Sequence, residues 1–544
     1  MQVEGKDNKE KLGLVISGSL IKGIDVKLNS DIAVEDIYVG RHVVIKGQQG
    51  SFFGLITDIS LENTDPYGMV AIPDIADSFV SQVLTGTTTF VRLHIMTSLI
   101  IGSDASTILE GPKPAKSIPP HFSPAFLASE QDIEIVFGKE NEKNFYIGTP
   151  LDMETKVCLD TKELVKRSNG IFGKSGTGKT FLTRLMLIGI LQKRAGVNLI
   201  FDMHNEYGWE GRSEKGFKVK GLKQLFPSKI AIFTLDEESS RRRKVKTDFV
   251  VRIGYDEIEP EDIALLRQTL NLTEAAVQAV FQLARNFGDR KWLLNFYELT
   301  DEESKDLAER LSIHEATMRN LKRGLQYLQR FKFLVPHTEE DSVKQILDYL
   351  ERGMNIVLEF GSYDDYVAYI LVANLLSRRI YDRYRTKTEK ALAEDGTEPI
   401  PLVIAIEEAH RFLNPEMASQ TIFGKIAREM RKYNVTLLVI DQRPSGIDDE
   451  IMSQLGTKIT CLLDNEKDVD SVMAGVSGKS ELKSVLSRLE TKQQALIFGH
   501  AVPMPVVIKT REYGSADSYK SFGSLDDGSD KKLDDNEFES LWKD

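Results

Sequence analysis

Residues 173–180 of this 544-residue chain have the sequence Gly173-Lys174-Ser175-Gly176-Thr177-Gly178-Lys179-Thr180. The stretch follows a short apolar segment, Asn169–Phe172, and precedes an amphipathic run, FLTRLMLIGILQK. Glycines let a backbone wrap around phosphate oxygens with its N–H groups pointing inward, and a helix that follows turns its positive end toward the same charge. An ordinary glycine-rich turn is the alternative, but the strand before the stretch and the helix after it are what a phosphate-binding loop requires. The stretch therefore predicts a strand–loop–helix unit that binds a nucleoside triphosphate.

The residues of this loop have separable expected roles. Lys179 reaches the β- and γ-phosphates, which makes it both a binding and a catalytic residue, and the hydroxyl of Thr180 lies on Mg²⁺. The predicted nucleotide-binding residues are Gly173, Lys174, Ser175, Gly176, Thr177, Gly178, Lys179, Thr180 and Phe181.

A second acidic site follows the apolar strand Leu402–Ile406, as Glu407-Glu408-Ala409-His410. We expect Glu407 to hold the metal and Glu408 to polarise the attacking water. The alternative is the solvated acidic start of a helix, where carboxylates favour the helix dipole. We expect His410 to be a capping or core residue, in preference to an orienting or sensing one.

The chain around these motifs alternates apolar strands with helical segments. Continuous apolar strands separated by helices indicate an α/β fold with a mainly parallel sheet covered on both faces. The expected strands are Val197–Phe201, Lys229–Phe233, Asn355–Phe360, Leu402–Ile406, Thr436–Ile440 and Lys458–Leu463. The helical stretch 260–352 is too long for a simple crossover and predicts an inserted bundle.

The first hundred residues differ from the rest, because short β-rich runs there are separated by Gly, Asn and Asp. Such runs predict a small barrel or sandwich, and Gly111–Pro124, which holds five prolines, predicts a stiff linker. The predicted divisions are a barrel over 1–110, a linker and leading strands over 111–160, the core over 161–514 and an acidic flexible tail over 515–544.

The composition limits the class of protein. Apolar residues make up 41% and charged residues 28%, which excludes a wholly disordered or fibrous chain. The net charge of −12 means that any contact with nucleic acid is local. Two cysteines, Cys158 and Cys461, suit a reducing compartment. With no signal peptide and no apolar run of about 20 residues, we expect a cytoplasmic protein without a membrane span.

These motifs together resemble HerA, a hexameric DNA-translocating ATPase of the FtsK/HerA branch of RecA-like P-loop NTPases. The resemblance also rests on Asp202-Met203-His204-Asn205-Glu206-Tyr207, on Gln442-Arg443-Pro444-Ser445 and on the segment Gly424–Lys432. It implies a RecA-like core with an N-terminal barrel and a helical insertion, ATP and Mg²⁺ as cofactors, and a homohexamer encircling double-stranded DNA. A partner nuclease or a defence effector would dock on the barrel.

The resemblance implies further site residues. Gln442 would sense the γ-phosphate, the alternative being a strand-end amide that satisfies the backbone. Arg428 or Arg431 would reach the nucleotide of a neighbouring subunit, the alternative being a solvated basic face. Many such motors have Asp where this chain has Glu407, whose longer side chain makes a direct metal role less certain. Asp202, His204 and Glu206 are expected to form a polar network around nucleotide and pore, in preference to a metal site.

Two functions follow from these predictions. In the first, the ring is a motor that translocates on DNA; in the second, it is a nucleotide-gated scaffold that activates an effector without sustained translocation. Basic residues predicted to contact DNA, or else to be simply solvated, are Lys215, Lys218, Lys220 and Lys223, and Arg241, Arg242, Arg243, Lys244 and Lys246. Nothing in the sequence supports sequence-specific reading of DNA.

Overall fold

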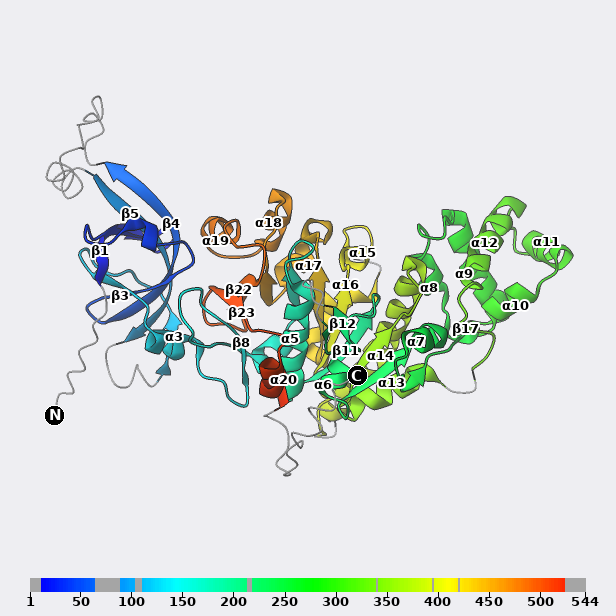
Figure 1. Ribbon diagram of the computed structural model, residues 1–544. Coiled ribbons are helices and arrows are strands. Elements are labelled where there is room, and N and C mark those ends of the chain that lie inside the picture. The colour runs from blue at the N-terminus through cyan, green and yellow to red at the C-terminus, as the bar shows by residue number, and fades with distance from the viewer. Residues whose placement is uncertain are drawn as a thin grey trace, which may run out of the picture.

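The structure is a computed structural model that describes residues 11–63, 89–102, 110–212, 218–338, 341–393, 396–418 and 421–523. Three parts lie in a row: a β-barrel at one end, an α/β core in the middle and a group of helices at the other end (Figure 1). Among the described residues, no helix combines the length and the apolar character needed to cross a membrane.

The N-terminal unit is a closed antiparallel barrel, which decides between the two predicted alternatives. Its sheet has the order β2-β1-β7-β3-β4-β5-β6, and pairing of β2 with β5 closes it. The strands are β1 (Lys11–Ser19), β2 (Gly23–Leu28), β3 (His42–Lys46), β4 (Gly50–Asn63), β5 (Thr89–Gly102), β6 (Lys113–Pro114) and β7 (Pro124–Leu127). Alternate residues of these strands fill a separate apolar core.

The barrel does not end at residue 110, which corrects the predicted boundary. Strand β7, from the segment assigned to the linker, lies between β1 and β3 and pairs with both. The proline-rich stretch therefore crosses the barrel and returns to complete it. Ala125 of β7 is fully buried, so the barrel core includes this strand.

The core is built on a 12-stranded sheet with the order β15-β14-β18-β11-β19-β20-β10-β21-β22-β23-β8-β9. Neighbours from β15 to β21 are parallel, and those from β21 to β9 are antiparallel. The strands are β8 (Asn144–Thr149), β9 (Val157–Asp160), β10 (Asn169–Phe172), β11 (Val197–Asp202), β14 (Ile230–Thr234), β15 (Phe249–Val250), β18 (Asn355–Glu359), β19 (Leu402–Glu407), β20 (Val435–Asp441), β21 (Thr457–Thr460), β22 (Gln494–Gly499) and β23 (Val506–Thr510).

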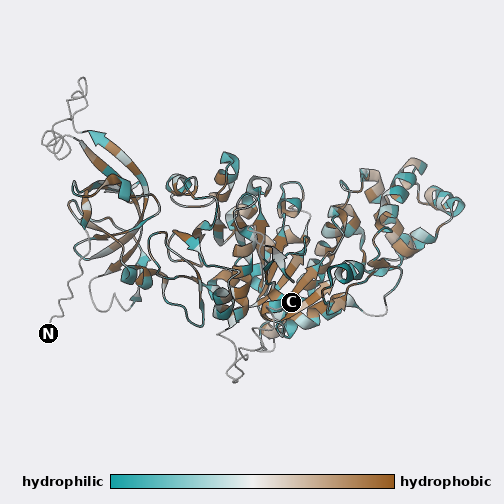
Figure 2. Ribbon diagram, in the orientation of Figure 1, coloured by the Kyte–Doolittle hydropathy of each residue, from teal (hydrophilic) through white to brown (hydrophobic). Residues whose placement is uncertain are grey.

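The parallel strands are apolar and almost entirely buried (Figure 2). Strands of this kind occur where both faces of a sheet are covered, as they are here. On β11, Leu199 and Phe201 belong to one buried cluster and Ile200 to the other. The first cluster takes in α13 (Ser342–Glu351), α14 (Tyr366–Ala393) and α16 (Ile422–Glu429), and the second takes in α5 (Lys179–Gln192). The shorter helices of this part of the chain are α3 (Glu130–Phe137), α4 (Thr161–Val165), α6 (Leu222–Leu225), α7 (Glu237–Arg243), α15 (His410–Leu413), α17 (Asp449–Gln454), α18 (Glu466–Val472) and α19 (Lys479–Leu486).

The predicted insertion 260–352 consists of two separate parts. Helices α8 (Pro260–Leu265), α9 (Glu274–Phe287), α10 (Trp292–Glu298), α11 (Asp301–Arg310) and α12 (Glu315–Leu328) form the group at the far end of the molecule (Figure 1). Helix α13, by contrast, packs its apolar side against β18 and β11. It therefore belongs to the sheet's cover and not to the inserted bundle.

The predicted flexible tail over 515–544 is wrong for its first part. Ala516–Gly523 forms α20, and its Tyr519 and Phe522 are buried. The two rings lie three residues apart on one helix face, and each has its centroid 5.8 Å from that of Tyr513. An aromatic pair therefore docks a segment whose composition is otherwise polar. Residues 524–544 lie outside the described part of the chain.

Candidate active site

A cavity of about 340 Å³ opens at the carboxyl ends of the parallel strands. It is lined by residues 175, 176 and 178–181, by the chain that follows β11, and by the ends of β19 and β20. Strand β10 lies between β20 and β21, so the loop that leaves it faces the ends of its neighbours. The carboxyl edge of a parallel sheet is where open α/β folds bind ligands.

Glycines shape the phosphate loop. Gly178 has φ 93° and caps the N-terminus of α5, and Gly176 has φ 77°. Residues with a Cβ rarely adopt such positive φ angles. A Cβ added at Gly173 would lie 2.8 Å from the Cβ of Cys461, so the loop also packs too closely for any side chain there. The sequence of the loop thus dictates a turn with its backbone open toward the cavity.

Side chains of the loop fix its curvature. Lys179 Nζ donates to the carbonyl of Lys174 at 2.9 Å, and Thr177 Oγ1 donates to the same carbonyl at 2.8 Å. Lys174 itself pairs with Asp464 at 2.9 Å and lies outside the set of residues that line the cavity. The predicted loop residues therefore cluster as a cradle, with Lys179 at its centre.

Oxygen ligands suitable for a hard cation stand beside the loop. Thr180 Oγ1 donates to Glu206 Oε2 at 3.1 Å, and Glu407 lines the same cavity. Magnesium prefers carboxylate, hydroxyl and water oxygens, so these residues fit the ion that the sequence predicts.

Glu407, the predicted metal residue, is held inside the protein. Its Oε1 accepts a hydrogen bond from Tyr207 O–H at 2.7 Å, and its backbone carbonyl accepts one from Tyr369 O–H at 3.2 Å. Burial, followed by the nearby charge of Asp202, raises the pKa of Glu407 to about 8. The carboxyl thus lines the cavity with one of its oxygens hydrogen-bonded to Tyr207.

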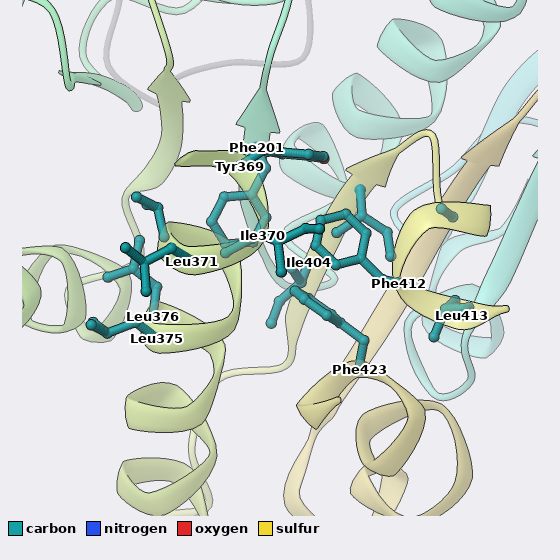
Figure 3. Close-up of a cluster of buried hydrophobic side chains, with 14 of the residues drawn as sticks. Phe201, Tyr369, Ile370, Leu371, Leu375, Leu376, Ile404, Phe412, Leu413 and Phe423 are labelled. Carbon is teal, nitrogen blue, oxygen red and sulfur yellow. The ribbon is translucent and has the colours of Figure 1, made fainter. Parts of the chain in front are cut away.

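Tyr369 belongs to a cluster of buried side chains that also contains Phe412 and Phe423 (Figure 3). Tyr369 of α14 packs edge-on against Phe412 with ring centroids 5.0 Å apart, and Phe412 packs against Phe423 at 4.9 Å. Such rings order the backbone that carries the two glutamates.

Glu408 faces the cavity because the backbone turns at this residue. Successive side chains of a strand point to opposite faces, but Glu408 has φ 48°, and both it and Glu407 line the cavity. Gln442 Nε2, from the end of β20, donates to Glu408 Oε1 at 3.3 Å. The structure brings together the predicted water-activating carboxylate and the predicted sensor amide, whose catalytic roles remain predictions.

Asp441 is a site residue that the sequence analysis missed. It is buried at the end of β20 and accepts the backbone N–H of His410 at 2.7 Å and that of Arg443 at 2.7 Å. His410 Nδ1 lies 3.0 Å from Asp441 and 3.6 Å from Glu408. His410 is therefore tied to Asp441 beside the active carboxylate. The sequence could have indicated Asp441 as a site residue, since it ends an apolar strand as Glu407 does.

The predicted polar network after β11 divides into separate roles. Asp202 is buried and accepts the backbone N–H groups of Glu206 and Tyr207 at 2.8 and 2.9 Å, which orders the loop. His204 and Glu206 line the cavity. Among the described residues, three potential metal ligands come within 4.8 Å of one another at Glu408, His410 and Asp441, and not in this loop.

The two candidate arginines have different surroundings. Arg428 Nε donates to Glu450 at 3.1 Å, and its guanidinium lies 3.6 Å from Asp448, so its charge is used within the subunit. Helix α16 ends at Glu429, and Arg431 lies exposed in a 3-10 turn, η4 (Met430–Tyr433). Arg428 therefore belongs to the helix and Arg431 to the turn that follows it.

Arg431 lies at the opposite edge of the sheet from the phosphate loop. Together with Arg167, it lowers the pKa of His500, whose own burial is the first cause. Arg167 lies just before β10, whereas Lys179 lies beyond the other end of that strand. Arg431 is consequently not placed to reach the nucleotide site of its own chain, and its action on a neighbouring subunit stays a prediction.

The first basic candidate set is partly engaged in ion pairs. Lys215 lies outside the described residues. Lys218 pairs with a nearby carboxylate at 2.8 Å, Lys223 does so at 3.0 Å, and Lys220 lies 5.5 Å above the ring of Tyr519.

The second basic set is more exposed. Arg243 pairs with the fully buried Glu359, and Arg241 pairs with Glu237 at 2.6 Å. The predicted contact of Arg243 with DNA is therefore wrong, because its charge neutralises a buried carboxylate. The remaining exposed residues of the set are Arg242, Lys244 and Lys246.

Comparison with known proteins finds similarity to one family of helicases. Residues 145–380 match the family model described as the central domain of helicase HerA. The "DNA double-strand break repair helicase HerA" of Pyrococcus furiosus is 26% identical over 412 residues, which cover 71% of this chain and 72% of that protein. A probable helicase of Methanocaldococcus jannaschii is 24% identical over 514 residues, covering 93% and 92%.

Among solved structures, VirB4 of Thermoanaerobacter pseudethanolicus is similar with a TM-score of 0.45 at 13% identity, covering 70% of this chain and 100% of that one. The strand order and the phosphate loop described above carry the fold assignment by themselves. With this family match over the site, the predicted resemblance is confirmed: residues 145–380 match the central domain of helicase HerA, and the chain is an ATPase.

Proposed function

We propose that this ATPase is a motor that moves along double-stranded DNA as a homohexameric ring, together with a partner nuclease or defence effector. The observation that carries the proposal is the convergence of Lys179, Glu408 and Gln442 on one cavity at the carboxyl edge of the sheet. The relatives named as DNA repair helicases favour DNA as the track.

The residues of the cavity have different roles in ATP hydrolysis. Lys179 binds the β- and γ-phosphates, Glu408 polarises the attacking water, and Gln442, hydrogen-bonded to Glu408, senses whether a γ-phosphate is present. Thr180 with the neighbouring carboxylates would hold Mg²⁺, which neutralises charge on the phosphates when it is bound.

The placement of the arginines supports the ring. A transferred phosphoryl group needs a guanidinium nearby, and Arg428 is engaged with Glu450 and Asp448. Arg431 is exposed at the far edge of the sheet from its own phosphate loop. A head-to-tail arrangement of subunits would bring it to the next nucleotide and close the ring.

DNA contact would be local, because the whole chain carries a net charge of −12. The exposed residues Arg242, Lys244 and Lys246 lie at the end of α7 and just after it. Repeated around a ring, this short basic segment would create a positive field for the phosphate backbone.

The partner protein would bind to the surface of the barrel. Its surface exposes large apolar side chains, with Ile21 90% and Phe122 74% exposed and Leu20 about half exposed. Apolar groups in solvent are costly unless another surface covers them, so they mark a docking face.

The test is the ATPase rate with and without long duplex DNA at low salt. We expect long DNA to raise the rate several-fold, the effect to weaken as salt is added, and Lys244→Glu with Lys246→Glu to reduce the stimulation while leaving the basal rate unchanged. A basal rate that long DNA does not change would refute the motor and favour the nucleotide-gated scaffold.

A further inference from the structure

The contact between Thr180 and Glu206 joins two segments that are distant in the fold. Thr180 lies in the first turn of α5, and Glu206 lies in the loop after β11. The hydroxyl of Thr180 donates to Glu206 Oε2 at 3.1 Å, and both residues line the cavity. Glu206 is exposed, so its second carboxylate oxygen is open to solvent and ions.

Glu407 has the opposite character. Its Oε1 accepts the O–H of Tyr207 at 2.7 Å, and its Oε2 is enclosed, with no hydrogen-bond partner among the described residues. One oxygen of this carboxyl is therefore occupied by the tyrosine, and the other is closed off from solvent.

The backbone at Glu206 is fixed independently of its side chain. Asp202 accepts the N–H of Glu206 at 2.8 Å, and buried Arg184 donates to its carbonyl oxygen. The preceding residue, Asn205, has φ 57° and exchanges hydrogen bonds with the backbone of Gly361 at 2.8 and 3.1 Å. These contacts fix the backbone from which the Glu206 side chain reaches the cavity.

We propose that Glu206, together with the hydroxyl of Thr180, holds the hydrated Mg²⁺ of the nucleotide, and that Glu407 supports the site without binding the ion. Magnesium retains several waters and is usually held by one or two carboxylates through them, a role that an exposed, preoriented carboxylate suits. The inference rests on the ATPase activity and not on movement along DNA.

The test is a binding measurement with Mn²⁺ as the probe. Free Mn²⁺ is followed by electron paramagnetic resonance as it is added to protein saturated with a non-hydrolysable ATP analogue. We expect Glu206→Gln to weaken Mn²⁺ binding by about 10- to 100-fold, the usual cost of removing a carboxylate that supports a metal. Affinity for the analogue without metal should be unchanged or higher, because a negative charge near the phosphates is lost.

Three further variants make the result decisive. Glu206→Asp, which keeps the charge on a shorter side chain, should fall between wild type and Glu206→Gln. Glu407→Gln should weaken Mn²⁺ binding less than Glu206→Gln does, and Glu210→Gln, at an exposed glutamate paired with Lys218, should bind Mn²⁺ like wild type. Circular dichroism checks that each variant is folded.

Wild-type Mn²⁺ affinity in both Glu206 variants, or a larger loss in Glu407→Gln, would overturn the proposal. Loss of binding of the analogue itself in wild-type protein would instead refute the nucleotide site, and the two failures are therefore distinguishable.

Discussion

Acidification should loosen the contact between barrel and core through one buried histidine. His42 of β3 is 5% exposed, its ring meets Phe137 of α3 edge-on with centroids 5.6 Å apart, and its Nε2 is enclosed without a hydrogen-bond partner in the described part of the chain. Burial lowers the pKa of His42 to about 4, against an opposing effect of Asp152. Asp152 is itself paired with Arg41 at 2.7 Å.

The sign of the effect follows from where the protons bind. In the unfolded chain the pKa of His42 is 6.5. Between pH 6.5 and about 4 the unfolded chain therefore binds a proton that the folded chain does not bind. The contribution of the neutral ring to stability is therefore complete above pH 6.5 and is lost as the pH falls. At about 1.4 kcal/mol per pKa unit, the loss reaches about 2 kcal/mol at pH 5 and about 3 kcal/mol below pH 4.

The assay is urea unfolding at pH 7.5 and pH 5.0 for wild type and His42→Gln, whose side chain does not titrate. We expect the wild-type free energy of unfolding to fall by about 2 kcal/mol more than that of the variant. Hydrogen exchange in β3 and α3 locates the change at the contact. The control is His121→Gln, an exposed histidine, which should behave as wild type does. Identical pH dependence in wild type and His42→Gln would refute the reasoning.

Two further predictions concern catalysis. Glu408→Gln should bind ATP normally and lose turnover by about 10²- to 10⁴-fold, because the water loses its polarising carboxylate; turnover close to wild type would show that the roles of the two glutamates are misassigned. Arg431→Ala should keep its ATP affinity and lose turnover by about 10³-fold or more, and mixing it with Lys179→Ala subunits should restore part of the rate. If pull-down of tagged subunits shows that subunits exchange and the ATPase rate is still not restored, Arg431 does not act between subunits. Arg428→Ala, by contrast, should mainly lower stability, because two carboxylates lose their partner.

The phosphate loop and the strands could be predicted from the sequence because their causes are local. The glycines of residues 173–178 determine the backbone angles of that loop themselves. Apolar runs such as Leu402–Ile406 determine strands that are buried on both faces. A carboxylate that directly follows such a strand, as Glu408 does, reaches the sheet's ligand edge wherever the strand lies in the order.

The remaining features depend on contacts between residues far apart in the chain, so only the tertiary structure decides them. The sequence places Glu206 in a polar loop, but the contact with Thr180 arises because α5 returns the chain to β11. Arg428 is an ordinary helical arginine until Glu450 lies beside it. Whether a charged side chain acts on a ligand or is used within the fold depends on these neighbours, because desolvation and pairing are set by three-dimensional packing and not by position along the chain.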